Sequence, residues 1–262
     1  MGPIVDLVAD LGEGFGSYSM GDDAALLEVV SSANIACGFH AGDPDIMKAT
    51  VAECVRRGVS IGAHPSFPDL RGFGRRAMDL TADEVRNDVL YQFGALSAFA
   101  AYHGTGVAHI APHGRLGNLV ATRADYAEAV ADAASRINPD LIVLAQDGAL
   151  AAAAARLQLP VGIVGIADRA YEADGTLVPR SRPGAVIHDP SAIVDRTIRM
   201  VCEGLIETVA GTDLPIVADT VLLHGDTPGA VQLARQVRAE LENAGVRIAP
   251  LAQVLAAKVT AA

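Results

Sequence analysis

Four of the seven histidines in this chain share one position, because each stands directly after a short apolar segment. They are His40, His64, His113 and His224. Five carboxylates occupy the same kind of position, namely Asp10, Glu13, Asp43, Asp168 and Asp226. Imidazoles beside carboxylates suit two kinds of chemistry: binding a divalent metal that activates water for attack on an amide, and moving protons during acyl or phosphoryl transfer. The pattern favours a catalytic site over a set of unrelated structural histidines.

The apolar segments that precede these residues recur along the chain and alternate with longer stretches of helical periodicity. Most of them are continuous apolar runs, which is typical of strands buried on both faces of a parallel sheet. We expect strands at 4–9, 35–38, 59–63, 107–111, 141–145, 161–166 and 219–223, with a candidate last strand at 246–248.

The starts and ends of the intervening helices are well marked. Helix starts are predicted at Asp43-Pro44, Asp189-Pro190, Thr227-Pro228 and the capping box from Thr81 to Glu84, and helix ends before Gly58 and Gly245. Asp43 and Asp226 each precede a helix, so a capping role and a role in the site both stay open for them.

About seven strand–helix units predict an α/β fold with a parallel sheet, either a barrel or a doubly wound sheet. No linker divides the chain, so we expect one domain over residues 1–262. Parallel strands bring their carboxyl ends to one rim, and the histidines and carboxylates should therefore meet in one pocket. Two long loops, 65–80 and 168–189, are rich in Gly, Pro, Arg and Asp, and we expect them to serve function.

Composition and motifs exclude several classes of protein. A net charge of −11 with no basic stretch argues against nucleic acid and anionic membranes as partners, and the most apolar window, 141–159, is interrupted by polar residues. Lys48 and Lys258 are the only lysines, which disfavours Schiff-base catalysis. Three separated cysteines and an opening without a signal-peptide pattern predict a cytoplasmic protein. P-loop, GxGxxG, GxSxG and HExxH motifs are absent from the sequence.

Several longer motifs resemble those of the LamB/YcsF family, which includes the A subunit of bacterial 5-oxoprolinase. The resemblance runs from Asp6 to about Leu251. The motifs that carry it are ADLGE at 9–13, SANIACGFHAGD at 32–43, IGAHPSFPD at 61–69, GFGRR at 72–76, YQ at 91–92, DRAY at 168–171, DG at 174–175, LVPR at 177–180 and LHGD at 223–226.

The resemblance implies a single-domain, seven-stranded parallel β/α barrel similar to the glycoside hydrolase/deacetylase group. It also implies a subunit of an ATP-dependent 5-oxoprolinase that opens the lactam of 5-oxoproline to L-glutamate, with subunits B and C as partners and ATP and Mg²⁺ as cofactors. The catalytic set would be Asp10, Glu13, His40, His64, His113 and His224. Substrate would be bound by Asp43, Arg75, Arg115, Asp168, Arg169, Arg180 and Asp226.

The chain departs from the family pattern at three positions near the expected rim. Val8 replaces an Asn, Ala111 replaces a Lys before Pro-His-Gly, and Gly117 replaces a Tyr. Arg115 is the nearest cation to the missing lysine, and we expect it to supply that charge. These departures leave the true substrate open.

Two other functions therefore stay open beside the oxoprolinase. One is a metal-dependent amidase or deacetylase that works without ATP, and the other is a barrel that has lost catalysis and serves as a binding or scaffold subunit. No HxH or HExxH spacing fixes three metal ligands, so we expect any divalent ion to bind weakly or to arrive with ATP.

Overall fold

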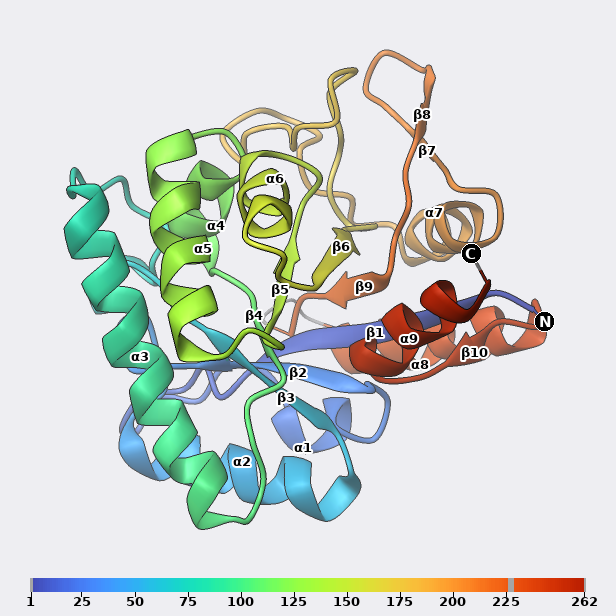
Figure 1. Ribbon diagram of the computed structural model, residues 1–262. Coiled ribbons are helices and arrows are strands. Elements are labelled where there is room, and N and C mark those ends of the chain that lie inside the picture. The colour runs from blue at the N-terminus through green and yellow to red at the C-terminus, as the bar shows by residue number, and fades with distance from the viewer. Residues whose placement is uncertain (1, 226–228, 262) are drawn as a thin grey trace.

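The predicted strands close into a parallel barrel (Figure 1). A computed structural model of the protein describes residues 2–225 and 229–261. Within them, seven strands pair in the order β1-β2-β3-β4-β5-β6-β9, and β9 pairs in turn with β1. The strands are β1 (Ile4–Leu11), β2 (Ser32–Ala36), β3 (Ser60–His64), β4 (His109–Ile110), β5 (Ile142–Ala145), β6 (Val161–Gly165) and β9 (Thr220–Leu223). The β1–β9 pairing decides between the two predicted architectures, and the seven-stranded β/α barrel is confirmed.

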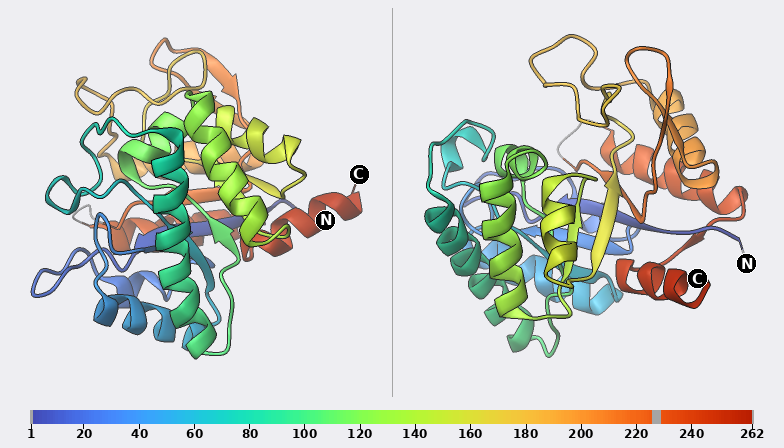
Figure 2. Two further views of the ribbon diagram at one scale, coloured as in Figure 1. Left: turned by 60° about the vertical axis from the view of Figure 1, so that its left-hand side comes forward. Right: turned by 45° about the horizontal axis from the view of Figure 1, so that its top comes forward.

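Helices surround this barrel on the outside, and both chain ends lie on the same side of the molecule (Figure 2). The helices are α1 (Asp23–Leu26), α2 (Pro44–Arg57), α3 (Ala82–Tyr102), α4 (Gly114–Val120), α5 (Ala124–Ile137), α6 (Ala149–Arg156), α7 (Pro190–Cys202), α8 (Ala230–Asn243) and α9 (Leu251–Ala261). Among the described residues, no helix is both long enough and apolar enough to cross a membrane.

The helix boundaries follow the signals in the sequence. Asp43 accepts hydrogen bonds from the first backbone amides of α2, the capping box of Thr81 and Glu84 is formed, and Gly58 ends α2 with φ 70°. Such a positive φ is easy for glycine and rare for other residues. The predicted helix start at Thr227-Pro228 lies outside the described residues, and α8 is described from Ala230 onward.

The interior of the barrel alternates between polar and apolar layers. Along β1, Asp6 is buried and hydrogen-bonded to hydroxyl groups, whereas Val8 lies in an apolar cluster. The other buried members of that cluster are Ala111, Ile142, Leu144 and Leu251. Asp10 comes next on the same face of the strand and borders an open cleft. The apolar layer therefore closes the barrel beneath the polar residues at its carboxyl end.

Two short elements lie outside the barrel ring. The candidate last strand is confirmed as β10 (Arg247–Ile248), which pairs with β1. A hairpin of β7 (Leu205–Glu207) and β8 (Asp213–Pro215) was not expected from the sequence. Its strands are only three residues long, too short to show a periodic pattern.

Candidate active site

A cleft of about 660 Å³ opens at the carboxyl ends of the barrel strands. Four of the predicted catalytic residues line it: Asp10, His64, His113 and His224. Arginines complete the lining, and these are Arg75, Arg115, Arg169 and Arg180. Both long loops contribute to the cleft, 65–80 through Arg75 and 168–189 through Arg169 and a run from Gly175 to Ser181. The structure thus brings together residues that are more than 200 positions apart.

Two histidines at the centre of the cleft face each other across a short distance. Nε2 of His64 lies 3.0 Å from Nδ1 of His113 and 3.3 Å from Oδ1 of Asp10. The outer nitrogen of each ring is held by a backbone carbonyl: His64 Nδ1 donates to Ala111 at 2.6 Å, and His113 Nε2 donates to Phe73 at 2.9 Å. Both rings are therefore fixed in orientation by the backbone of neighbouring segments.

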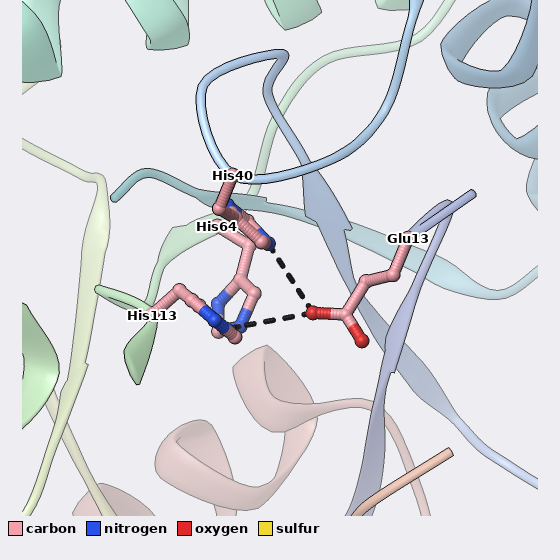
Figure 3. A group of neighbouring side chains, drawn as sticks. All are labelled: Glu13, His40, His64 and His113. Atoms are coloured by element: carbon pink, nitrogen blue, oxygen red, sulfur yellow. Dashed lines mark hydrogen bonds and ion pairs between the residues drawn. The ribbon is translucent and has the colours of Figure 1, made fainter. Parts of the chain in front are cut away.

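Glu13 and His40 complete this group of side chains (Figure 3). Oε1 of Glu13 lies 3.2 Å from Nε2 of His40 and 3.4 Å from Nδ1 of His113. The rings of His40 and His113 stack with centroids 3.8 Å apart and planes inclined by 6°. Because each residue follows a different strand, the group exists only in the folded barrel.

Burial controls the charges in this group. Burial lowers the pKa of His113 to about 3 and lowers the pKa of His40 well below its usual value, with further lowering from neighbouring histidines. Burial by itself raises the pKa of Asp10, but the charge and hydrogen bond of His64 outweigh it and leave the pKa below its usual range. At neutral pH, His40 and His113 are therefore neutral and Asp10 is a carboxylate.

His224 forms part of another wall of the cleft and is paired with Asp168, which does not itself line the cleft. Nδ1 of His224 donates to Oδ2 of Asp168 at 2.8 Å, and a guanidinium nitrogen of Arg180 lies 3.4 Å from His224 Nε2. Burial acts to lower the pKa of His224, but the charge of Asp168 and its hydrogen bond raise it overall. His224 and His113 thus differ: the pKa of His224 is raised, whereas that of His113 is lowered.

The arginines of the cleft are positioned by the loops. Arg169 is buried and donates to the carbonyls of Val178 and Ala185, so it also braces the 168–189 loop. Burial lowers its pKa to about 10, which still leaves it charged at neutral pH. Nε of Arg115 is buried and has no hydrogen-bond partner among the described residues. The cleft therefore offers cationic groups beside its acid–base residues.

One of the predicted substrate-binding carboxylates, Asp43, caps a helix. Oδ1 of Asp43 accepts from the amides of Asp45 and Ile46, and Oδ2 accepts from Gly16 at 2.6 Å. Backbone amides engage both oxygens of Asp43, so its predicted capping role is confirmed. Asp43 does not line the cleft, and its role in binding substrate stays a prediction. Asp226 lies outside the described residues.

Several residues at the site were missed in the sequence. Asn34 donates to Asp10 at 2.9 Å and accepts from Nε2 of His109 at 2.8 Å, so this pair orients the Asp10 carboxylate. The sequence signal that could have revealed Asn34 is a polar amide side chain within an otherwise buried strand. Gln146 and Asp147 also line the cleft, and they follow β5 as the histidines follow their strands.

The three departures from the family pattern have different surroundings. Val8 and Ala111 lie in the apolar layer beneath the cleft, although Ala111 also borders the cleft. A Cβ atom on Gly117 would lie 2.4 Å from the carbonyl oxygen of Pro112, so a side chain there requires the backbone to move. The departures from the family pattern therefore lie in two places, the apolar floor of the cleft and its α4 side.

The fold and the site define this protein as a β/α-barrel protein with a histidine–carboxylate cleft at the carboxyl ends of its strands. The chain belongs to the LamB/YcsF family, whose model matches residues 5–256. It is 50% identical over 250 residues to the A subunit of 5-oxoprolinase from Rhodopseudomonas palustris, covering 95% of this chain and 98% of the relative. The A subunit of 5-oxoprolinase from Azorhizobium caulinodans is also 50% identical, over 95% of this chain and 99% of its own length.

A solved structure extends the likeness to three dimensions. The lactam utilization protein from Thermus thermophilus superimposes with a TM-score of 0.89 at 42% identity, covering 94% of this chain and 99% of that protein. A peptidoglycan deacetylase from Bacillus subtilis has a TM-score of 0.53 at 12% identity, which concerns the fold alone. The expected likeness to the deacetylase group of barrels is thereby confirmed for the fold.

Proposed function

We propose that this chain is the ring-opening subunit of an ATP-dependent 5-oxoprolinase, which hydrolyses the lactam of 5-oxoproline to L-glutamate. One observation carries the proposal: a single cleft is lined by Asp10 beside His64, by His224, whose pKa its partner Asp168 raises, and by several arginines. The names of the relatives, the A subunit of 5-oxoprolinase and a lactam utilization protein, support the choice of a lactam as the substrate.

The substrate has two features that this cleft can recognise. Its carboxylate suits a guanidinium, which binds carboxylates through two parallel hydrogen bonds. Arg115 is the candidate for this contact, since its buried Nε lies at the cleft without a hydrogen-bond partner among the described residues. Its lactam then lies between the Asp10–His64 pair and the Asp168–His224 pair.

Ring opening requires one proton to leave water and one to reach the ring nitrogen. Asp10, which is a carboxylate at neutral pH, accepts the proton of the water molecule as the water oxygen bonds to the lactam carbonyl carbon. His224, whose pKa is raised by Asp168, gives a proton to the ring nitrogen as the C–N bond breaks. The product carries an amine and a new carboxylate, which is glutamate.

ATP enters the proposal through partner subunits. A five-membered lactam is a stable amide. Transfer of the γ-phosphoryl group of ATP to its carbonyl oxygen leaves ADP and makes the carbonyl carbon easier to attack. After the C–N bond breaks, a second water molecule hydrolyses the resulting acyl phosphate to the carboxylate and inorganic phosphate. We assign ATP and Mg²⁺ to complexes with subunits B and C, in the cytoplasm, and the arginines of this cleft to holding the negative phosphoryl group. The relatives are named as one lettered subunit of 5-oxoprolinase, which supports assembly with further subunits.

Reconstitution tests this function. The purified chain is mixed with subunits B and C, 5-oxoproline, ATP and Mg²⁺, and glutamate formation is measured. We expect glutamate only when all three subunits and ATP are present. Absence of glutamate with all components would contradict the proposal.

A metal-dependent amidase is the second candidate, and the group of Glu13, His40, His64 and His113 favours it. Its donor atoms all lie within 4.8 Å of one another. Amide hydrolysis by the isolated chain with a divalent metal and without ATP would support this candidate over the first.

A further inference from the structure

We propose that the cleft contains a binding site for one divalent transition-metal ion, Zn²⁺ or Mn²⁺, held by His64, His113, Glu13 and Asp10. The donor atoms are Nε2 of His64, Nδ1 of His113, Oε1 of Glu13 and Oδ1 of Asp10. His40 is assigned as a positioning residue for Glu13. The inference rests on the side chains alone and holds whether or not 5-oxoproline is the substrate.

The hydrogen bonds of the His64 and His113 imidazoles show which of their nitrogens carry hydrogen. The outer nitrogens of His64 and His113 both face backbone carbonyl oxygens, which only accept, so both carry hydrogen. The inner nitrogens then face each other at 3.0 Å with one lone pair each. Two lone pairs repel, so either a proton or a metal ion must lie between them.

The surroundings of the inner nitrogens favour a metal ion. In metal sites, a ligating histidine donates its other N–H to a carbonyl or carboxylate, which fixes the ring. Both His64 and His113 do this. Two imidazole nitrogens with two carboxylate oxygens are a donor set suited to Zn²⁺ or Mn²⁺ and less suited to Mg²⁺ or Ca²⁺.

The separations between donor atoms match those around a metal. Bonds of ~2.0–2.1 Å at tetrahedral angles place neighbouring ligand atoms about 3.3 Å apart. The separations here are 3.0 Å between the two imidazole nitrogens, 3.3 Å from His64 to Asp10 and 3.4 Å from His113 to Glu13. These three separations each fit two ligands of one ion.

Ring stacking excludes His40 as a ligand beside His113. An imidazole binds a metal in the plane of its ring, and the two rings are nearly parallel with centroids 3.8 Å apart. Their lone pairs therefore cannot meet at one point. His40 Nε2 instead lies 3.2 Å from Glu13 Oε1, where it donates and orients the carboxylate toward His113.

Gly74 allows the loop to close over these rings. Its φ is +65°, and a Cβ atom there would lie 2.1 Å from Ser66 Oγ and 2.8 Å from His113 Cδ2. The absence of a side chain lets the adjacent carbonyl of Phe73 reach His113. The backbone at Phe73 and Gly74 therefore packs directly against the His113 ring and fixes its orientation.

A bound ion would supply a Lewis acid beside the cleft and lower the pKa of a bound water.

Metal binding by the full-length chain tests the proposal without an activity assay. The protein is stripped with chelator, titrated with Zn²⁺ and Mn²⁺ by calorimetry, and its stoichiometry is measured by elemental analysis. We expect one ion per chain, a rise in the melting temperature on adding metal, and a Co²⁺ form whose visible spectrum indicates nitrogen and oxygen ligands.

Variants connect that binding to the named residues. His64→Ala, His113→Ala and the isosteric Glu13→Gln should abolish stoichiometric binding, and His40→Ala should weaken it by about 10–100-fold. His103→Gln, at the end of α3, is the matched control and should bind as the unchanged protein does. Circular dichroism of each metal-free variant shows whether it is folded. Stoichiometric binding by folded Glu13→Gln, or no binding by the unchanged protein, would overturn the proposal.

Discussion

Nδ1 of His224 and Oδ2 of Asp168 lie 2.8 Å apart, and this ion pair raises the pKa of the imidazole despite its burial. If His224 donates the proton to the ring nitrogen, activity is present below its pKa and is lost as the pH rises through it. Asp168→Asn removes the charge that raises this pKa. The alkaline limb of the kcat/KM profile should therefore move to lower pH, and activity at pH 7 should fall about 10–100-fold. Asp174→Asn, in the same loop, is the control, and an unchanged alkaline limb in Asp168→Asn would count against this role.

Arg115 should carry the positive charge that the family places at position 111. Its Nε is buried at the cleft without a hydrogen-bond partner among the described residues, so a bound anion can take that contact. Removing one partner of a desolvated charge pair costs about 2–5 kcal/mol, so Arg115→Ala should lower kcat/KM at least about 30-fold in the reconstituted assay. Arg123→Ala, whose guanidinium pairs with Asp125, should leave it unchanged. Equal activities for the two variants, or an inert protein that Ala111→Lys activates, would refute this compensation.

Asp6 should make the stability of the barrel depend on pH. Burial raises its pKa to about 6 from 3.8, although hydroxyl groups of Ser31, Ser32 and Thr220 donate to it. The folded state therefore favours the neutral form, and its contribution is complete below about pH 4 and lost as the pH rises through about 6. The loss amounts to about 3 kcal/mol of unfolding free energy.

Urea unfolding between pH 4 and 7 measures this effect. Asp6→Asn has no titrating carboxyl at that position and should lack this part of the pH dependence, whereas Asp140→Asn on the surface should retain it. Parallel curves for Asp6→Asn and the unchanged protein would show that Asp6 does not titrate in this range.

Gly74 and Gly184 separate the effect of crowding from that of backbone strain. Both have positive φ, +65° and +78°, but an added Cβ meets Ser66 and His113 at Gly74 and nothing within 4 Å at Gly184. Alanine at either position should cost about 1 kcal/mol for its backbone conformation. Only Gly74→Ala should also displace His113 and lose most of the glutamate-forming activity. Similar activities for the two variants would contradict the packing described around His113.

The sequence pattern predicted a parallel α/β fold, because most of the buried strands are continuous apolar runs, but it left a barrel and a doubly wound sheet both open. The seven-stranded barrel was implied by the resemblance to the family. The sequence pattern also placed His64, His113 and His224 at one rim, since parallel strands share a direction. The contacts between these side chains could not be predicted in the same way. His64 faces His113 and His224 faces Asp168, and both contacts depend on how the barrel closes and on the paths of the loops. Asp43 shows a further limit of prediction from sequence. A carboxylate before a helix has the same sequence pattern whether it caps the helix or binds substrate.

Glutamate formation by reconstituted complexes that differ only at Asp10 tests the central claim most directly. The claim is that the lactam opens in this cleft, and Asp10 is the carboxylate at its centre. With ATP and subunits B and C present, Asp10→Asn should lower the rate of glutamate formation at least about 100-fold. Asp45→Asn, an exposed carboxylate on α2, should leave the rate unchanged. Equal rates for the Asp10 and Asp45 variants would place ring opening elsewhere and contradict the account.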